Sequence, residues 1–94
     1  MIMENGGGHS VRYRTFCKNQ REAAITINKI IDDYWNQTLS EQEMKEWIFC
    51  IYKNNDDKII RNGTYTKIVQ QQCGKKRISV MTKVLEEMRS DDEN

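Results

Sequence analysis

Two successive amphipathic patterns between residues 18 and 53 constrain the fold of this chain more than any other feature of its sequence. From Ala23 to Trp35, apolar side chains recur at the i, i+3, i+4 and i+7 spacing of one helical face, which predicts a helix over about residues 18–36. Asn19, followed by Glu22 three residues later, is a variant of the signal that starts a helix. The apolar stripe is broad, so this helix is expected to pack against two other elements.

A second helix is predicted to start after Ser40, an N-cap residue that forms a capping box with Glu43. Leu39 and Met44 occupy the two positions of a hydrophobic staple, and the apolar face continues from Met44 to Tyr52. The link over residues 36–39 is short, so the two helices are predicted to be antiparallel neighbours. The tryptophans of this hairpin then lie near the same end, and both are expected in the core: Trp35 and Trp47.

Shorter patterns beyond the hairpin complete the predicted fold. Ile59 and Ile60 are predicted on a short helical segment ended by Asn62-Gly63. A helix over residues 66–73 and a last helix over residues 75–89 follow, with Gly74 between them. The expected fold is a small all-α domain of four to five helices, in which an antiparallel hairpin supports a C-terminal helix-turn-helix-like unit.

The chain is expected to form one domain over residues 11–89, between a flexible tail at residues 1–10 and a disordered acidic tail at residues 90–94. Residues 11–16 alternate loosely, as a short strand or an extended arm does. One strand cannot form a sheet in a monomer, so an extended arm is favoured unless the protein dimerises through this segment.

The charge of the chain is divided unevenly along its length. Residues 58–85 contain no Asp or Glu and carry seven Lys and Arg, although the net charge of the whole chain is only +1. One interpretation is a directional surface for an anionic partner. The other is a monomer whose acidic helices pair with its own basic segment.

The basic triplet Lys75-Lys76-Arg77 follows Gly74 directly. If a helix begins there, three cations occupy its first turn and oppose the helix dipole by roughly 0.3–1 kcal/mol each, which favours an anion-binding role. If one helix runs unbroken from residue 66 to 89, the triplet is an ordinary solvated face. The sequence leaves both interpretations open.

A helix-turn-helix centred on Gly74 predicts a DNA-binding surface. Gln70 and Lys75 depart from the motif, because a small residue and an apolar residue are usual at those two positions. A basic arm that enters the minor groove is a further element of this hypothesis. The predicted nucleic-acid-binding residues are Lys67, Gln71, Lys75, Lys76, Arg77, Ser79, Lys83, Arg12 and Arg14.

Catalytic chemistry is not expected. The one histidine, His9, lies in the glycine-rich tail, and no His-centred triad, metal-ligand cluster or phosphate loop is present, so we expect no enzyme, metal or cofactor. Cys73 falls in the apolar register and is expected to be buried. The three cysteines are odd in number and far apart, and no apolar run is long enough to span a membrane, which favours a reducing, cytoplasmic location.

Three segments carry a resemblance to a known family: residues 19–22, residues 30–35 and residues 65–77. They resemble a family of short, uncharacterised proteins from clostridia and their relatives, over about residues 11–88. The resemblance implies a bacterial cytoplasmic protein and brings no activity with it. Beside the DNA-binding hypothesis stands a module for protein interaction or homodimerisation, which the small core and the broad stripe of the first helix favour.

Overall fold

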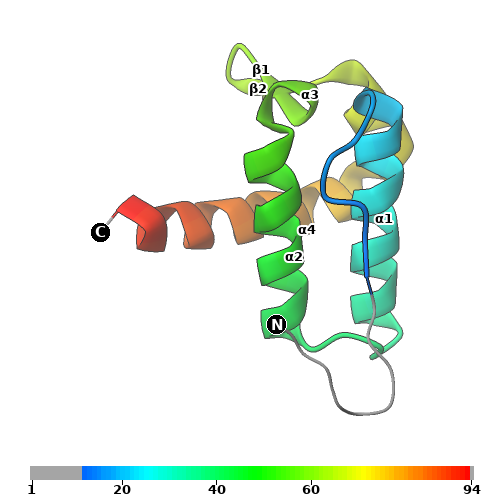
Figure 1. Cartoon of the computed structure of the whole chain (residues 1–94), viewed down its shortest axis with the longest axis vertical. Coiled ribbons are helices and arrows are strands. Elements are labelled where there is room, and N and C mark those ends of the chain that lie inside the picture. The colour runs from blue at the N-terminus through cyan, green and yellow to red at the C-terminus, as the bar shows by residue number, and fades with distance from the viewer. Residues whose placement is uncertain (1–11, 94) are drawn as a thin grey trace.

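A computed structural model gives the structure of this protein and describes residues 12–93, with side chains up to Arg89. Two antiparallel helices, α1 (Gln20–Trp35) and α2 (Glu41–Asn54), stand side by side (Figure 1). An extended arm over residues 12–19 runs across one face of this pair, and α4 (Lys67–Glu93) crosses the opposite face (Figure 1). The predicted all-α fold and its antiparallel hairpin are confirmed.

Both hairpin helices begin where local side-chain chemistry predicts. The Asn19 side chain accepts a hydrogen bond from the Glu22 backbone N–H, which caps α1. The capping box of α2 is complete: Ser40 accepts from the Glu43 N–H, and the Glu43 carboxylate accepts from the Ser40 N–H. These bonds satisfy backbone donors that a helix start otherwise leaves free.

A β-hairpin replaces the second half of the short helical segment predicted at Ile59 and Ile60. Helix α3 (Asp56–Ile59) ends at Ile59, and Ile60 begins strand β1 (Ile60–Arg61), which pairs antiparallel with β2 (Thr64–Tyr65). Asn62 and Gly63 both have positive φ, 54° and 81°. Asn-Gly favours this two-residue turn, whose twist matches that of paired strands. The prediction for Ile60 is therefore wrong: the dipeptide turns a hairpin instead of ending a helix.

The arm is held firmly against the α1–α2 pair. Buried Asn55 accepts a hydrogen bond from the Cys17 N–H and donates one to the Thr15 carbonyl oxygen, at 2.9 and 2.8 Å. Tyr13 donates to the Asp33 carboxylate on α1 and stacks edge-on against Trp47 on α2, with ring centroids 4.9 Å apart. The extended arm predicted over residues 11–16 is confirmed for residues 12–16, which form neither helix nor strand; Val11 lies outside the described residues.

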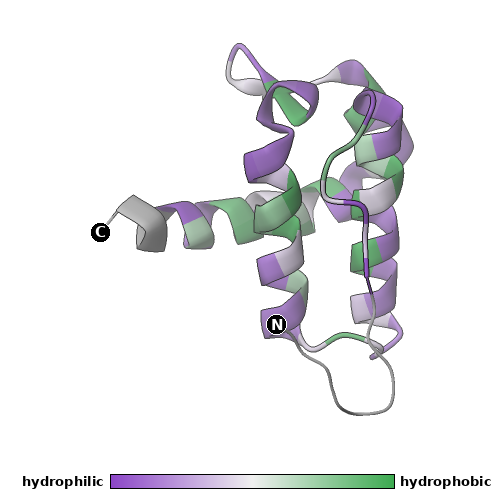
Figure 2. Cartoon of the chain, in the orientation of Figure 1, coloured by the Kyte–Doolittle hydropathy of each residue, from purple (hydrophilic) through white to green (hydrophobic). Residues whose placement is uncertain are grey.

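The core lies where the inward faces of the helices meet, and apolar residues line those faces (Figure 2). Its largest fully buried side chains include Met81 of α4 and six isoleucines of α1, α2 and α3. These isoleucines are Ile27, Ile30, Ile31, Ile48, Ile51 and Ile59. The prediction that both tryptophans are in the core is wrong for Trp35, whose exposed fraction is 45%. Trp35 is the last residue of α1, where the helix extends past the core-facing turns.

Candidate nucleic-acid interface

The chain bends at Gly74. Its backbone angles, φ 78° and ψ 170°, are not helical and fall in a region that only glycine occupies readily. They divide α4 into a first segment, residues 67–73, and a second segment, residues 75–93. Of the two interpretations that the sequence left open, the bent one is correct. The corner is a single residue, tighter than the three- or four-residue turn of a helix-turn-helix.

The side chains on the inner side of the bend are buried. Val69 and Cys73 are buried on the first segment and Met81 on the second. The Cys73 thiol lies 3.9 Å from the Ala24 carbonyl oxygen on α1, and burial raises the pKa of this thiol to about 11. Cys73 is therefore the buried small apolar residue that its register predicted, and its thiol stays protonated at neutral pH.

Arg77 joins the bend to α1. Its Nε and Nη2 atoms both donate to the Asp32 Oδ1 atom, at 3.0 and 2.7 Å, and its Nη1 atom donates to the Cys73 carbonyl oxygen at 3.3 Å. The guanidinium also lies over the Trp35 ring, 5.5 Å from its centroid. One cation of the triplet is thus neutralised by the chain's own carboxylate and acts within the fold.

The other two cations of the triplet project from the start of the second segment. Lys75 and Lys76 are exposed, and Ser79 and Lys83 continue an exposed face along the next two turns. None of the three lysines Lys75, Lys76 and Lys83 has an ion-pair partner among the residues that the structure describes. The face turns acidic one turn later, at Glu86 and Glu87. The cationic patch is defined here as Lys75, Lys76, Ser79 and Lys83.

Three acidic side chains of α1 and α4 make ion pairs with other cations. Asp32 binds Arg77, and Asp33 lies 3.8 Å from the Lys29 ammonium. Glu87, on α4 itself, binds Lys45 of α2 at 2.6 Å, which ties the second segment to the hairpin. The self-neutralising monomer considered from the sequence is therefore realised at Arg77, which pairs with Asp32 of α1, but not at the cationic patch.

The remaining predicted residues belong to other segments of the chain. Lys67 and Gln71 are exposed on the first segment of α4. Arg12 and Arg14 are exposed on the arm, but Arg14 lies 3.6 Å from the Glu22 carboxylate and the arm is bound to the helices. The predicted entry of this arm into a minor groove stays a prediction.

Sequence reasoning missed the contribution of Asp32 and Trp35 to this site. They stand 45 and 42 residues before Arg77, so local spacing carries no signal of the contact. Within residues 12–93, no group of three or more His, Cys, Asp or Glu side chains is placed to hold a metal ion. No helix of that part of the chain is long and apolar enough to cross a membrane.

Comparison with known protein families gives a match over most of the chain. A family model with a Clostridium-derived name, described as a conserved hypothetical protein, matches residues 14–86. The matched range contains all three segments on which the predicted resemblance rests and confirms it. No curated protein and no solved structure matches the chain.

Proposed function

The chain belongs to this family of conserved hypothetical proteins, and we propose that it is a non-enzymatic nucleic-acid-binding module. The observation that carries the proposal is the cationic patch: a glycine bend presents two exposed lysines in the first turn of a helix, with no carboxylate bound to them among the described side chains. Charges placed against the helix dipole and left unneutralised favour an anionic partner.

The position of the patch suits a duplex. In helix-turn-helix proteins the N-terminal residues of the second helix contact the nucleic acid. Lys75 and Lys76 occupy that position here, Ser79 offers a hydroxyl one turn later, and Lys83 adds a cation one turn further. Lysine binds phosphate as a point charge, so the proposed contact is mainly to the sugar-phosphate backbone, with Gln71 as a further polar contact.

Fluorescence anisotropy with a labelled DNA duplex at several salt concentrations tests the proposal. Affinity should fall with a log–log slope of about −0.9 for each phosphate contacted. The double variant Lys75→Ala/Lys76→Ala should bind about tenfold more weakly at low salt and should reduce the slope by about 2. Lys29→Ala/Lys53→Ala, which removes the same charge from α1 and α2, is the matched control and should bind like the wild type. If the wild type does not bind duplex DNA at low salt, the proposal is rejected.

A variant that should strengthen binding provides a second test. Asp32→Asn removes the carboxylate that neutralises Arg77 and releases the guanidinium beside the cationic patch. DNA affinity should then rise about threefold, because a phosphate contact becomes available and a repelling charge is lost. An unchanged affinity in this variant would place the DNA contact away from the bend.

The exposed apolar residues favour a protein-interaction module as the alternative. Four large apolar side chains on the arm, α1 and α4 are exposed: Phe16 (70%), Ile25 (49%), Trp35 (45%) and Ile68 (37%). Sedimentation velocity over a hundredfold concentration range distinguishes the two functions. A concentration-dependent dimer that Ile25→Ser weakens would support self-association, and a strict monomer would count against it.

A further inference from the structure

A second group of cations lines a pocket where four segments of the chain meet. The pocket has a volume of about 460 Å³ and lies between the start of α1, α3, β1 and the first segment of α4. Arg21, Lys58 and Arg61 line it, together with Asp57 and Ile68. These residues come from positions up to 47 apart in the sequence, and none of them belongs to the cationic patch.

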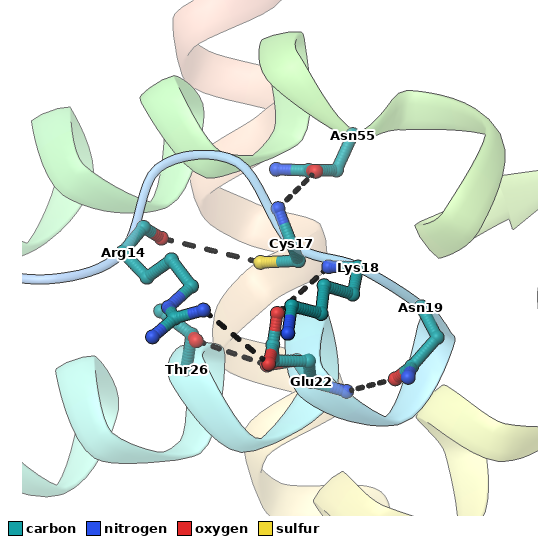
Figure 3. A network of polar contacts seen from close by, with 7 residues as sticks. All are labelled: Arg14, Cys17, Lys18, Asn19, Glu22, Thr26 and Asn55. Carbon is teal, nitrogen blue, oxygen red and sulfur yellow. Dashed lines mark hydrogen bonds and ion pairs between the residues drawn. The ribbon is translucent and has the colours of Figure 1, made fainter.

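The charge of this pocket is not balanced by the chain. Asp57 is the one carboxylate in its lining, so three cations leave a net charge of +2. The acidic residue nearest in sequence to Arg21 is Glu22, whose carboxylate points to the arm (Figure 3). There it accepts a hydrogen bond from the Lys18 N–H at 2.7 Å and pairs with Arg14 at 3.6 Å. The Glu22 carboxylate therefore belongs to the network at the start of α1 and is not part of the pocket lining.

One of the three cations is held in place. The Arg61 Nε atom donates to the Asp57 carbonyl oxygen at 3.0 Å, which fixes the planar guanidinium at the pocket. Its Nη atoms have no hydrogen-bond partner among the side chains and backbone that the structure describes. A guanidinium held through one edge presents its other donors for bidentate binding of a phosphate. Ile68, 37% exposed, adds an apolar surface to the same lining.

We propose that this pocket binds a phosphate monoester carried on a compact organic group. A monoester carries a charge of about −1.5 to −2 at neutral pH, which matches the net charge of the lining, whereas a backbone diester carries only −1. The volume falls in the range of small-molecule sites, so a sugar or base lies against Ile68 while the phosphate contacts Arg21, Lys58 and Arg61.

Two kinds of ligand carry such a phosphate monoester: a free mononucleotide and the 5′-phosphorylated end of a nucleic acid. The first is independent of the proposed nucleic-acid binding, and the second rests on it. In both cases the phosphate needs its second negative charge, so affinity should rise about fourfold from pH 5.5 to pH 7 as the monoester loses its second proton near pH 6.

The first experiment compares adenosine 5′-monophosphate with adenosine, by NMR titration of the ¹⁵N-labelled full chain. The monophosphate should shift the backbone amides of Arg21, Lys58 and Ile68, and adenosine should not. Arg21→Ala/Arg61→Ala should weaken binding at least tenfold. Lys58→Gln, which removes one charge without shortening the side chain greatly, should weaken it about threefold. The amide spectrum of each variant verifies that it is folded.

The second experiment compares a 5′-phosphorylated oligonucleotide with the same strand ending in a 5′-hydroxyl. Tighter binding of the phosphorylated strand, lost in Arg21→Ala/Arg61→Ala, supports the pocket even if the free mononucleotide does not bind. The pocket proposal is overturned if the phosphate adds nothing in either experiment: the monophosphate binds no more tightly than adenosine, and the 5′-phosphorylated strand binds no more tightly than the 5′-hydroxyl strand. Lys75→Ala/Lys76→Ala should leave monophosphate binding unchanged, so failure of the pocket and failure of the cationic patch are distinguished.

Discussion

The start of α2 and the start of the second segment of α4 carry opposite charges at the positive end of a helix dipole. At α2 the capping box of Ser40 and Glu43 satisfies backbone donors, and Glu41 and Glu43 complement the positive end of the helix dipole. At Gly74 the backbone turns sharply and places Lys75, Lys76 and Arg77 in the first turn. The first start is fully explained by stability. The second is unfavourable for stability except at Arg77, which Asp32 neutralises.

The difference teaches where to look for function in this molecule. Local charges that oppose the fold and have no internal partner contribute nothing to its stability, so their role is sought in an external ligand. The pocket of Arg21, Lys58 and Arg61 is a second place where cations outnumber the carboxylates beside them. The criterion excludes Lys45, whose ammonium binds Glu41 and Glu87 and holds α4 to α2.

Replacing Gly74 removes the bend on which the contrast with α2 depends, and it should change stability more than any other substitution proposed for this chain. Gly74→Ala forces an L side chain into φ 78° and ψ 170°, although nothing lies within 4 Å of the added Cβ atom, so backbone strain alone should lower the free energy of unfolding by about 2 kcal/mol. Denaturant unfolding measures this change, and DNA binding should be lost if the bend straightens. Gly63→Ala, at φ 81° in the β-hairpin, is the matched control: it should destabilise by about 1 kcal/mol and leave DNA binding intact.

The buried Cys73 thiol on the inner side of the bend predicts a loss of stability at alkaline pH. The pKa of Cys73 is about 11 in the fold, against an ordinary value of 9.0, so between these values the unfolded chain releases the proton and the folded chain retains it. Stability should therefore fall as pH rises above 9, by up to about 1.4 kcal/mol per pH unit from this thiol. Unfolding of the wild type and of Cys73→Ala at pH 8 and pH 10 measures the difference. Equal pH dependence in the two proteins would contradict a buried thiol at this position.

Removing the cap of α2 tests whether the start of this helix serves stability alone. Ser40→Ala deletes one bond of the capping box and should lower the free energy of unfolding by about 1 kcal/mol. DNA affinity should not change, because the capping box belongs to the fold. A loss of DNA binding in this stably folded variant would show that the start of α2 also contacts the ligand.

The smallest expected change in stability is an increase, and it comes from removing the exposed lysines of the bend. Lys75→Ala and Lys76→Ala each remove a cation from the unfavourable end of a helix dipole, so each should raise the free energy of unfolding by about 0.3–1 kcal/mol. The gain should shrink at high salt, where exposed charges are screened. Thermal unfolding of the double variant gives the measurement. Destabilisation by this variant would mean that the lysines serve the fold, and the contrast with α2 would disappear.

Much of the fold was predictable because it depends on short-range chemistry. The periodicity of α1, its Asn19 cap and the Ser40 capping box each involve residues within one or two turns of each other. The bend was one of two interpretations, since glycine permits a positive φ but does not require it. The hairpin at Asn62-Gly63 was missed although the dipeptide favours it, because Ile59 and Ile60 fit a short helical segment equally well.

The sequence alone was enough to place α1 and α2 along the chain and to show the excess of cations between residues 58 and 85, because spacing and composition are properties of the chain. Only the tertiary structure decided which cations are neutralised. The crossing of α4 over α1 brings Asp32 and Trp35 to Arg77 and leaves Lys75 and Lys76 outside, and the meeting of four segments gathers Arg21, Lys58 and Arg61. Such partners are set by how helices cross in space, and sequence separation carries no record of that geometry.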